Sequence, residues 1–191
     1  MGQIIEGIDL RPGNAYIRNG NIYRVIENSF MKTAQSKGIV KCKVKNLRTG
    51  AITIEVLTDA KVEKADLNSI IMTFSYIDGE NYVFIDSTTF ETVEISKSRL
   101  GKEAKYITDG LEVRILKYGE EVLDIILPDQ VVVLLVDAEE AVRGNTASGS
   151  AMKKAWTENG YEVTVPQFIK KGEKILISTS TDEYVGRAKD E

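Results

Sequence analysis

Apolar and cationic residues alternate most clearly at residues 39–46. The apolar positions are Val40, Cys42 and Val44, and the positions between them are Lys41, Lys43 and Lys45. Successive side chains of a β-strand point to opposite faces, so a period of two predicts a strand with one buried and one solvated face. Cys42, the single cysteine of the chain, is then expected to be a small buried residue.

Shorter segments with the same period occupy the rest of the first third of the chain, at residues 15–17, 22–26 and 51–57. The dipeptide Asn19-Gly20 lies between the first two and is a strong signal for a β-hairpin. A polar stretch at residues 58–68 then interrupts the pattern. Four or five short strands up to residue 66 predict a small barrel of SH3-like size, with a domain boundary there.

The second third repeats this organisation with one addition. Strands are predicted at residues 71–76, 82–85, 111–118 and 121–126, with Asp78-Gly79 as a hairpin turn. Residues 96–107 have the spacing of a short helix, with Leu100 and Ala104 on one face. A short helix among about five strands has the proportions of an oligonucleotide-binding (OB) fold.

The last third begins after Leu127-Pro128-Asp129. Residues 131–136 are all apolar and bounded by polar residues, which predicts a buried strand. Residues 143–149 are small and polar and predict a loop. Further strands are expected at 162–165, 174–178 and 183–188. The sequence therefore predicts an all-β chain of three consecutive small barrels, in domains 1–66, 67–129 and 130–191.

Composition narrows the possible functions. The chain has 191 residues and no histidine, which removes the usual general base, the usual zinc ligand and every histidine-assisted nucleophile. We expect a binding protein, with no catalytic residue, metal or cofactor. The sequence shows neither a signal-peptide pattern nor an apolar run long enough to span a bilayer, so we expect a cytoplasmic protein without membrane contact.

Charge is uneven along the chain. Residues 1–66 carry 11 basic and 7 acidic residues, whereas residues 67–129 carry 6 and 12. The lysine row at 41, 43 and 45 continues into Lys32, Lys37 and Arg48. One interpretation is a loop on a basic strand that enters an RNA-lined crevice. The other is a solvated strand face, because lysine is common on exposed strands, where it discourages aggregation.

Several motifs, in the same order, carry a resemblance to a known family. In the first two thirds they are Phe30-Met31-Lys32, Lys43-Val44-Lys45-Asn46-Leu47-Arg48-Thr49-Gly50 and Met72-Thr73-Phe74-Ser75-Tyr76-Ile77-Asp78-Gly79. In the last third they are Val142-Arg143-Gly144-Asn145-Thr146-Ala147, Val165-Pro166-Gln167-Phe168-Ile169, Gly172-Glu173-Lys174-Ile175 and Glu183-Tyr184-Val185-Gly186-Arg187. Together they resemble bacterial elongation factor P over essentially the whole chain.

The resemblance implies a fold and a function. The expected fold is an SH3-like (KOW-type) domain I followed by two OB-fold domains, arranged as an L of roughly tRNA shape. The expected function is to bind the 70S ribosome between the peptidyl (P) and exit (E) sites and to rescue synthesis stalled at consecutive prolines. The implied partners of the monomeric factor are ribosomal RNA and proteins, the P-site peptidyl-tRNA, and messenger RNA in the E site.

The tip of domain I, residues 31–37, departs from the family pattern. The family tip is Lys-Pro-Gly-Lys-Gly, and an ungapped count places Lys32-Thr33-Ala34-Gln35-Ser36 there, followed by Lys37. Gln35 thus occupies the position where the family carries a modified lysine or arginine, and a glutamine cannot accept a lysine-type extension. We expect an unmodified tip that meets the P-site tRNA, and Lys37 is the alternative modified residue if the loop register slips by two.

Two further groups are implied by the resemblance. Gly144-Asn145-Thr146 stands where the family has Gly-Asp-Thr, a loop that meets the E-site codon; the alternative is an ordinary surface turn. Tyr184 and Arg187 are similar to a tRNA-facing pair; the alternative is a half-buried tyrosine and a solvated arginine. Lys41, Lys43, Lys45 and Arg48 are the expected RNA-phosphate contacts.

Two other functions compete with this one. A general RNA-binding or RNA-chaperone protein could use the same barrels, but it would need aromatic residues on their faces for base stacking, and here the tyrosines are scattered. An enzyme with Lys32 or Lys37 as nucleophile would need a desolvated pocket, which an exposed loop does not provide.

Overall fold

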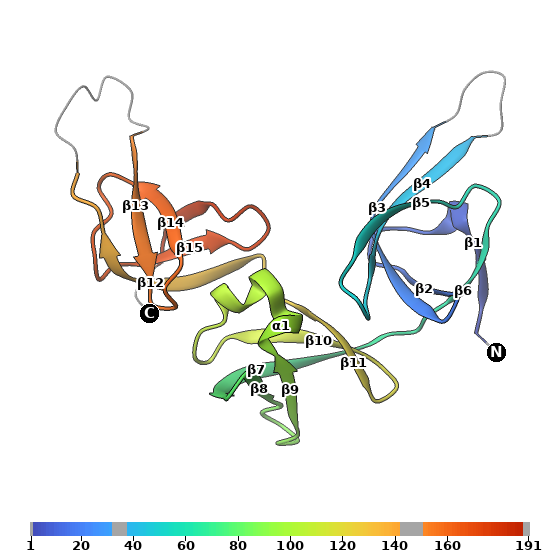
Figure 1. The fold of residues 1–191 in the computed structure, drawn as a ribbon, viewed down its shortest axis with the longest axis horizontal. Helices are drawn as coiled ribbons and strands as arrows, with labels where there is room; N and C mark the ends of the chain where they lie inside the picture. Colours follow the sequence, from blue (N-terminus) through green and yellow to red (C-terminus); the bar gives the residue numbers. More distant parts are fainter. Residues whose placement is uncertain (1, 32–37, 142–150, 189–191) are drawn as a thin grey trace. The chain divides into compact units, whose positions relative to one another are not determined.

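The computed structural model describes residues 2–31, 38–141 and 151–188, and these residues form three antiparallel sheets (Figure 1). They fall into two compact units, one of Met1–Ile70 with Ile115–Ile125 and one of Ile71–Arg114 with Ile126–Glu191. The described part of the chain is mostly β, as predicted.

The first sheet covers most of the first 64 residues. Its strands are β1 (Ile4–Glu6), β2 (Ala15–Arg18), β3 (Asn21–Met31), β4 (Ile39–Asn46), β5 (Ile52–Val56) and β6 (Lys61–Lys64), and a 3-10 turn, η1 (Gly7–Asp9), follows β1. The strand order among the described residues is β1-β6-β2-β3-β4-β5. The predicted hairpin is confirmed, since Asn19 and Gly20 both have positive φ between β2 and β3.

The first sheet has more strands than the sequence indicated, because β6 lies inside the polar stretch 58–68. Its only buried residue is Val62, so the alternation is too short to detect. Backbone pairing defines this strand, because β6 pairs with β1 on one side and with β2 on the other. The count of four or five strands was therefore too low.

The alternation of β4 is confirmed residue by residue. Val40, Cys42 and Val44 are each no more than 4% exposed, and Lys41 and Lys43 face solvent. The buried residues of β4 contribute to the first core, which also contains Leu10, Tyr16, Val25, Leu57 and Val62. A second cluster in this unit joins Ile22 and Leu47 to Leu123, which comes from the hairpin of residues 115–125.

The second sheet has the order β11-β10-β7-β8-β9. Its strands are β7 (Asn68–Asp78), β8 (Asn81–Ile85), β9 (Thr92–Ser96), β10 (Glu112–Tyr118) and β11 (Glu121–Ile126). The predicted helix is confirmed as one α-helical turn, α1 (Lys97–Leu100), continued by a 3-10 segment, η2 (Gly101–Tyr106). Leu100 and Ala104 are buried, as their spacing predicted.

The third sheet has the order β14-β13-β12-β15-β16. Its strands are β12 (Gln130–Ala138), β13 (Met152–Thr157), β14 (Glu162–Pro166), β15 (Lys174–Ser178) and β16 (Tyr184–Arg187). The predicted strand at 131–136 is present, but only one of its two faces is buried. Val131, Val133 and Leu135 are buried, whereas Val132 and Val136 are each 44% exposed. The sequence also did not indicate β13, in which lysines interrupt the apolar residues.

Candidate functional site

The hairpin of β3 and β4 is longer than the strand beside it, and this length positions the candidate site. β4 pairs with β5 only as far as Lys41 opposite Val56. Beyond that point β3 and β4 continue as a two-stranded ribbon, with Phe30 opposite Val40 and Met31 opposite Ile39. The ribbon extends past the other strands of its unit in Figure 1. The predicted tip residues Lys32, Thr33, Ala34, Gln35, Ser36 and Lys37 lie outside the described residues.

Three apolar side chains surround the end of this ribbon. Phe30, Met31 and Ile39 are 54%, 58% and 42% exposed, and we call them the apolar collar. Gly38 leaves space for the collar, because a Cβ at Gly38 would overlap the ring of Phe30. The collar was not predicted, although Phe and Met in succession at the end of a strand, beside a polar loop, are a sequence signal for it.

The outer face of the sheet combines cationic and apolar rows. Lys41 and Lys43 lie directly across from Val56 and Ile54 of β5, which is an edge strand among the described residues. Ile54 is 71% exposed. Glu27 lies 3.4 Å from the Nζ of Lys43, and within the described part of the chain Lys41 has no ion pair. This face therefore presents a free and a weakly paired lysine next to the apolar edge.

The other two predicted phosphate contacts have carboxylate partners in the same unit. The Nζ of Lys45 lies 2.9 Å from Asp124. Arg48 forms a bidentate pair with Glu121, at 3.0 Å from Nε to Oε1 and 2.9 Å from Nη2 to Oε2, and it also donates to the carbonyl of Gly20. The hydrogen bonds that Arg48 donates to the carboxylate of Glu121 raise the pKa of Arg48. Lys45 and Arg48 thus join the end of β4 to β11, and their contact with RNA stays a prediction.

The core behind the lysine row contains two titratable groups that remain protonated. Tyr16 donates a hydrogen bond of 2.8 Å to Glu55, and burial together with this carboxylate raises the pKa of Tyr16 far above its ordinary value. Burial, and secondarily Glu55, raises the pKa of the Cys42 thiol. Neither group is therefore an activated nucleophile near neutral pH.

Tyr184 and Arg187 lie on β16, three residues apart. Strict alternation would place them on opposite faces. A register irregularity between Leu176 and Ile177 sets Tyr184 opposite Ile177 and Arg187 opposite Ile175, so both lie across from buried residues.

Both residues of this pair have contacts within the chain. Tyr184 packs partly against the third core. The Nε of Arg187 donates to Glu173 at 2.9 Å, and its guanidinium lies 5.1 Å from the ring centre of Phe168. A tRNA contact of either residue stays a prediction, and the loop residues Gly144, Asn145 and Thr146 lie outside the described residues.

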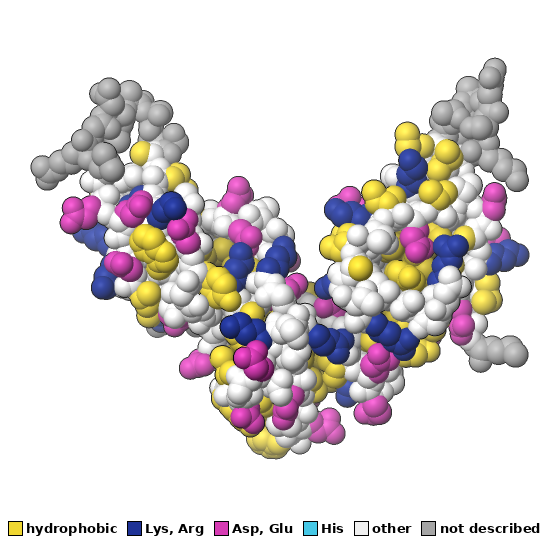
Figure 2. Space-filling model, viewed as in Figure 1, with side chains coloured by type: hydrophobic (Ala, Val, Ile, Leu, Met, Phe, Trp, Pro, Cys, Tyr) yellow, Lys and Arg dark blue, Asp and Glu magenta, His cyan; other side chains and the backbone are white. Residues whose placement is uncertain are grey.

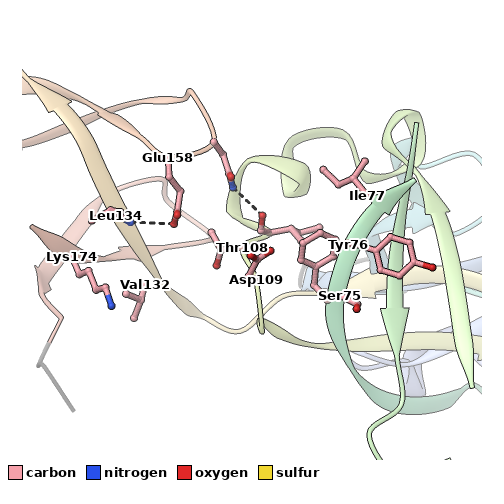
Figure 3. Close-up of a pocket in the computed structure, with 12 residues that line it drawn as sticks. Ser75, Tyr76, Ile77, Thr108, Asp109, Val132, Leu134, Glu158 and Lys174 are labelled. Carbon is pink, nitrogen blue, oxygen red and sulfur yellow. Dashed lines mark hydrogen bonds between the residues drawn. The ribbon is translucent and has the colours of Figure 1, made fainter. Parts of the chain in front are cut away.

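An open groove of about 710 Å³ lies in the second unit (Figure 3). Ser75, Tyr76 and Asp109 line one side, and Val132 and Lys174 line the other. The carboxylate of Glu158 accepts a 3.4 Å hydrogen bond from the backbone N–H of Leu134, as the dashed line in Figure 3 shows. The groove mixes carboxylates, hydroxyls and one lysine, and its polar groups do not converge on one point.

Two further kinds of site are absent from the described residues. They contain no group of three or more acidic, cysteine or histidine side chains that could hold a metal ion. No helix among them is long and apolar enough to cross a membrane.

Comparison with known proteins assigns every domain to one family. Residues 6–62 match the KOW-like domain of elongation factor P (EF-P), residues 67–125 its OB domain, and residues 131–187 its C-terminal domain. An elongation factor P of Malacoplasma penetrans is 57% identical over 189 residues, which are 99% of this chain and 100% of that protein. One of Ureaplasma parvum serovar 3 is 54% identical over the same shares.

Among solved structures, a eukaryotic translation initiation factor 5A from Methanococcus jannaschii has a TM-score of 0.48 at 16% identity, covering 65% of this chain and 94% of that one. The matches to the three domain models and the full-length relatives supply the assignment. The chain belongs to the elongation factor P family of translation factors.

Proposed function

We propose that this protein binds the ribosome between the P and E sites and accelerates peptide-bond formation at consecutive prolines by positioning the P-site peptidyl-tRNA. The observation that carries the proposal is the match of all three domains, in order, to elongation factor P. A full-length relative of that name is 57% identical to this chain. Family membership implies ribosome interaction, and the site and substrate are our extension of it.

The proposed mechanism needs no acid or base from the protein. Bond formation between two tRNA-bound groups depends on their alignment, and holding reactants in a productive geometry lowers the barrier without proton transfer. Proline has a fixed φ and aligns poorly. A chain without histidine, whose Tyr16 and Cys42 stay protonated, is suited to this positioning role and not to general acid–base catalysis.

We propose two different tasks for the cations at and after β4. Lys41 and Lys43 remain available on the outer face and are the proposed contacts with RNA phosphates. Lys45 and Arg48 are engaged by Asp124 and Glu121 and fix the base of the hairpin. The pairing of Lys45 and Arg48 with β11 supports the proposed positioning role of this hairpin.

The apolar collar has a matching place in the proposal. Phe30, Met31 and Ile39 surround the point where the ribbon ends, and their exposed surface is suited to packing on ribose and base faces near the tRNA end. In domain III, Gly144-Asn145-Thr146 is the proposed contact with the E-site codon, and Tyr184 with Arg187 the proposed contact with tRNA. We further propose that the protein acts in the cytoplasm as a monomer, with no modification at Gln35.

A translation assay with two matched messages tests the proposal. One message encodes three consecutive prolines and the other replaces them with alanines. Addition of the purified protein should accelerate synthesis through the prolines and leave the alanine message unchanged. Equal stimulation of both messages would indicate a general RNA-binding protein, and no stimulation of either would refute the proposal.

A further inference from the structure

Phe90 has a largely exposed side chain and an unfavourable backbone conformation. Its side chain is 77% exposed, the highest fraction among the exposed large apolar residues that the structure describes. It lies in the turn between β8 and β9 with a φ of 60°. In this region the Cβ of an L-residue crowds its own backbone, and a bulky residue is seldom found there.

Comparison with similar positions shows why Phe90 is unusual. The other non-glycine residues with positive φ in the described ranges are Asn19 and Asp182. Asn and Asp tolerate this conformation because their short side chains bond to nearby backbone. Phe90 gains neither that bond nor substantial burial, so folding stability does not account for a phenylalanine at this position.

Hydrogen bonds within the turn hold Phe90 in place. Its N–H donates to the carbonyl of Asp86 at 2.8 Å, and the N–H of Asp86 donates to the carbonyl of Glu91 at 2.9 Å. The carboxylate of Asp86 accepts from the N–H groups of Thr88 and Thr89, at 2.7 and 3.1 Å. The ring is therefore presented to solvent on an ordered turn, with little conformational freedom to lose on binding.

The charge around this turn indicates the kind of surface that it fits. Residues 78–96 contain five acidic residues and no lysine or arginine; the acids are Asp78, Glu80, Asp86, Glu91 and Glu94. Figure 2 shows hydrophobic and acidic side chains together at the end of the hairpin formed by β8 and β9. The hydrogen bonds from Thr88 and Thr89 lower the pKa of Asp86, which keeps it charged. Such a surface repels phosphates and attracts a basic protein surface.

We propose that Phe90 is a docking anchor whose ring enters an apolar pocket, rimmed by lysine or arginine, on a protein component of the ribosome. The inference rests on the proposed ribosome binding and extends it to a second surface, the turn between β8 and β9. Aromatic side chains held on an ordered turn are typical anchors of protein interfaces, because they bury a large area at a small entropic cost.

Photo-crosslinking identifies the class of partner. The photoreactive p-benzoylphenylalanine is placed at position 90 in one variant and at position 41 in a second, and each is irradiated with purified ribosomes. Crosslinking of position 90 to a ribosomal protein supports the anchor. Crosslinking to RNA alone, or none from position 90 while position 41 reacts, overturns it. If neither position reacts and the unchanged protein does not bind ribosomes, the proposed function itself fails.

Substitution separates an anchor from a structural residue. Phe90→Gly relieves the positive φ, so its Tm should equal or exceed that of the unchanged protein by about 2–4 °C. Its ribosome affinity should fall about tenfold or more, and Phe90→Tyr should stay within about twofold. Asn19→Gly is the matched control, since it relieves a φ of 50° in the first sheet and should leave affinity unchanged. Unchanged affinity in Phe90→Gly, or a fall in its Tm, contradicts the proposal.

Discussion

At the scale of single residues, the base of the tip depends on a glycine that has no special backbone angle. Gly38 matters for space: a Cβ there would overlap the ring of Phe30, across the ribbon from it. Phe30 is itself more than half exposed, so its ring has room to swing away. The effect of a larger residue at 38 should therefore appear in the geometry of the collar more than in the stability of the fold.

Gly38→Ala tests this spacing. We expect a reduced rate on the triple-proline message with a loss of stability of only about 1 kcal/mol or less, because the displaced ring is exposed. Phe30→Ala removes the obstacle, so Gly38→Ala added to that variant should cause no further loss of rate. Rates and Tm values of the four proteins form a double-mutant cycle, and additive rate losses would disprove the contact.

At the scale of elements, β4 carries cations with two different roles along its length. Its middle lysines, Lys41 and Lys43, face solvent beside the apolar row of β5. Its last lysine, Lys45, pairs with Asp124, 79 residues away in the sequence. The distinction follows from the hairpin of β10 and β11, which packs on the end of β4 through Leu123 and supplies the carboxylates.

Substitution of the solvent-facing lysines and of the paired lysine should have different effects. Lys41→Ala with Lys43→Ala should reduce the slope of log affinity against log salt for ribosome binding by about one to two, with an unchanged Tm. Lys45→Ala leaves the half-buried Asp124 without its cation and should lower the free energy of unfolding by about 1–2 kcal/mol. Salt-dependent binding and thermal unfolding measure the two effects. An equal salt slope in the first variant would remove Lys41 and Lys43 from the RNA contact.

At the scale of the whole molecule, the compact units do not follow the order of the three sheets. In the second unit, residues of η2 and Ile107 contact the turns that join strands of the third sheet. The side chain of Asn159 donates to the carbonyls of Lys105 and Ile107, at 3.2 and 2.9 Å. Lys105 lies 2.7 Å from Asp182, and Tyr106 is part of the third core. Residues 101–107 should therefore be protected by contacts with the C-terminal third of the chain.

Asn159→Ala is expected to loosen this junction. It removes two side-chain hydrogen bonds to backbone, which should cost about 1–2 kcal/mol and speed amide exchange at residues 101–107. Asn81→Ala is the control, because Asn81 makes a single exposed bond to Glu94 in a hairpin. Hydrogen exchange measured by mass spectrometry compares the variants. Unchanged exchange at 101–107 in Asn159→Ala would show that other contacts hold the segment.

Prediction from sequence succeeded where a local pattern specified the structure and failed where packing specified it. The alternation of Val40, Cys42 and Val44 gave a strand with the right buried face. The uniform run at 131–136 also gave a strand, but its hydrophobicity could not reveal that Val132 and Val136 face outward. No local pattern predicted β6, because this strand is defined by its pairing with β1 on one side and β2 on the other.

The candidate site likewise combines features that a local pattern predicts with features that only packing determines. The basic character of β4 was evident from sequence, but the carboxylate partners of Lys45 and Arg48 were not, because they lie more than 70 residues further along the chain. The apolar collar and the proposed anchor at Phe90 were not predicted, because residue type does not determine the exposure of a side chain or its backbone φ. The pairing of Tyr184 with Ile177 and of Arg187 with Ile175 includes a register irregularity that alternation does not predict.

The sequence by itself determined an all-β chain, its principal turns and the exclusion of histidine chemistry, because these follow from residue type and short-range periodicity. The tertiary structure decided which lysines are free, which are paired, and which aromatic rings are presented to solvent. Those properties depend on segments far apart in the chain and on a backbone conformation set by the hydrogen bonds of a turn. They emerge only when the strands are assembled into sheets.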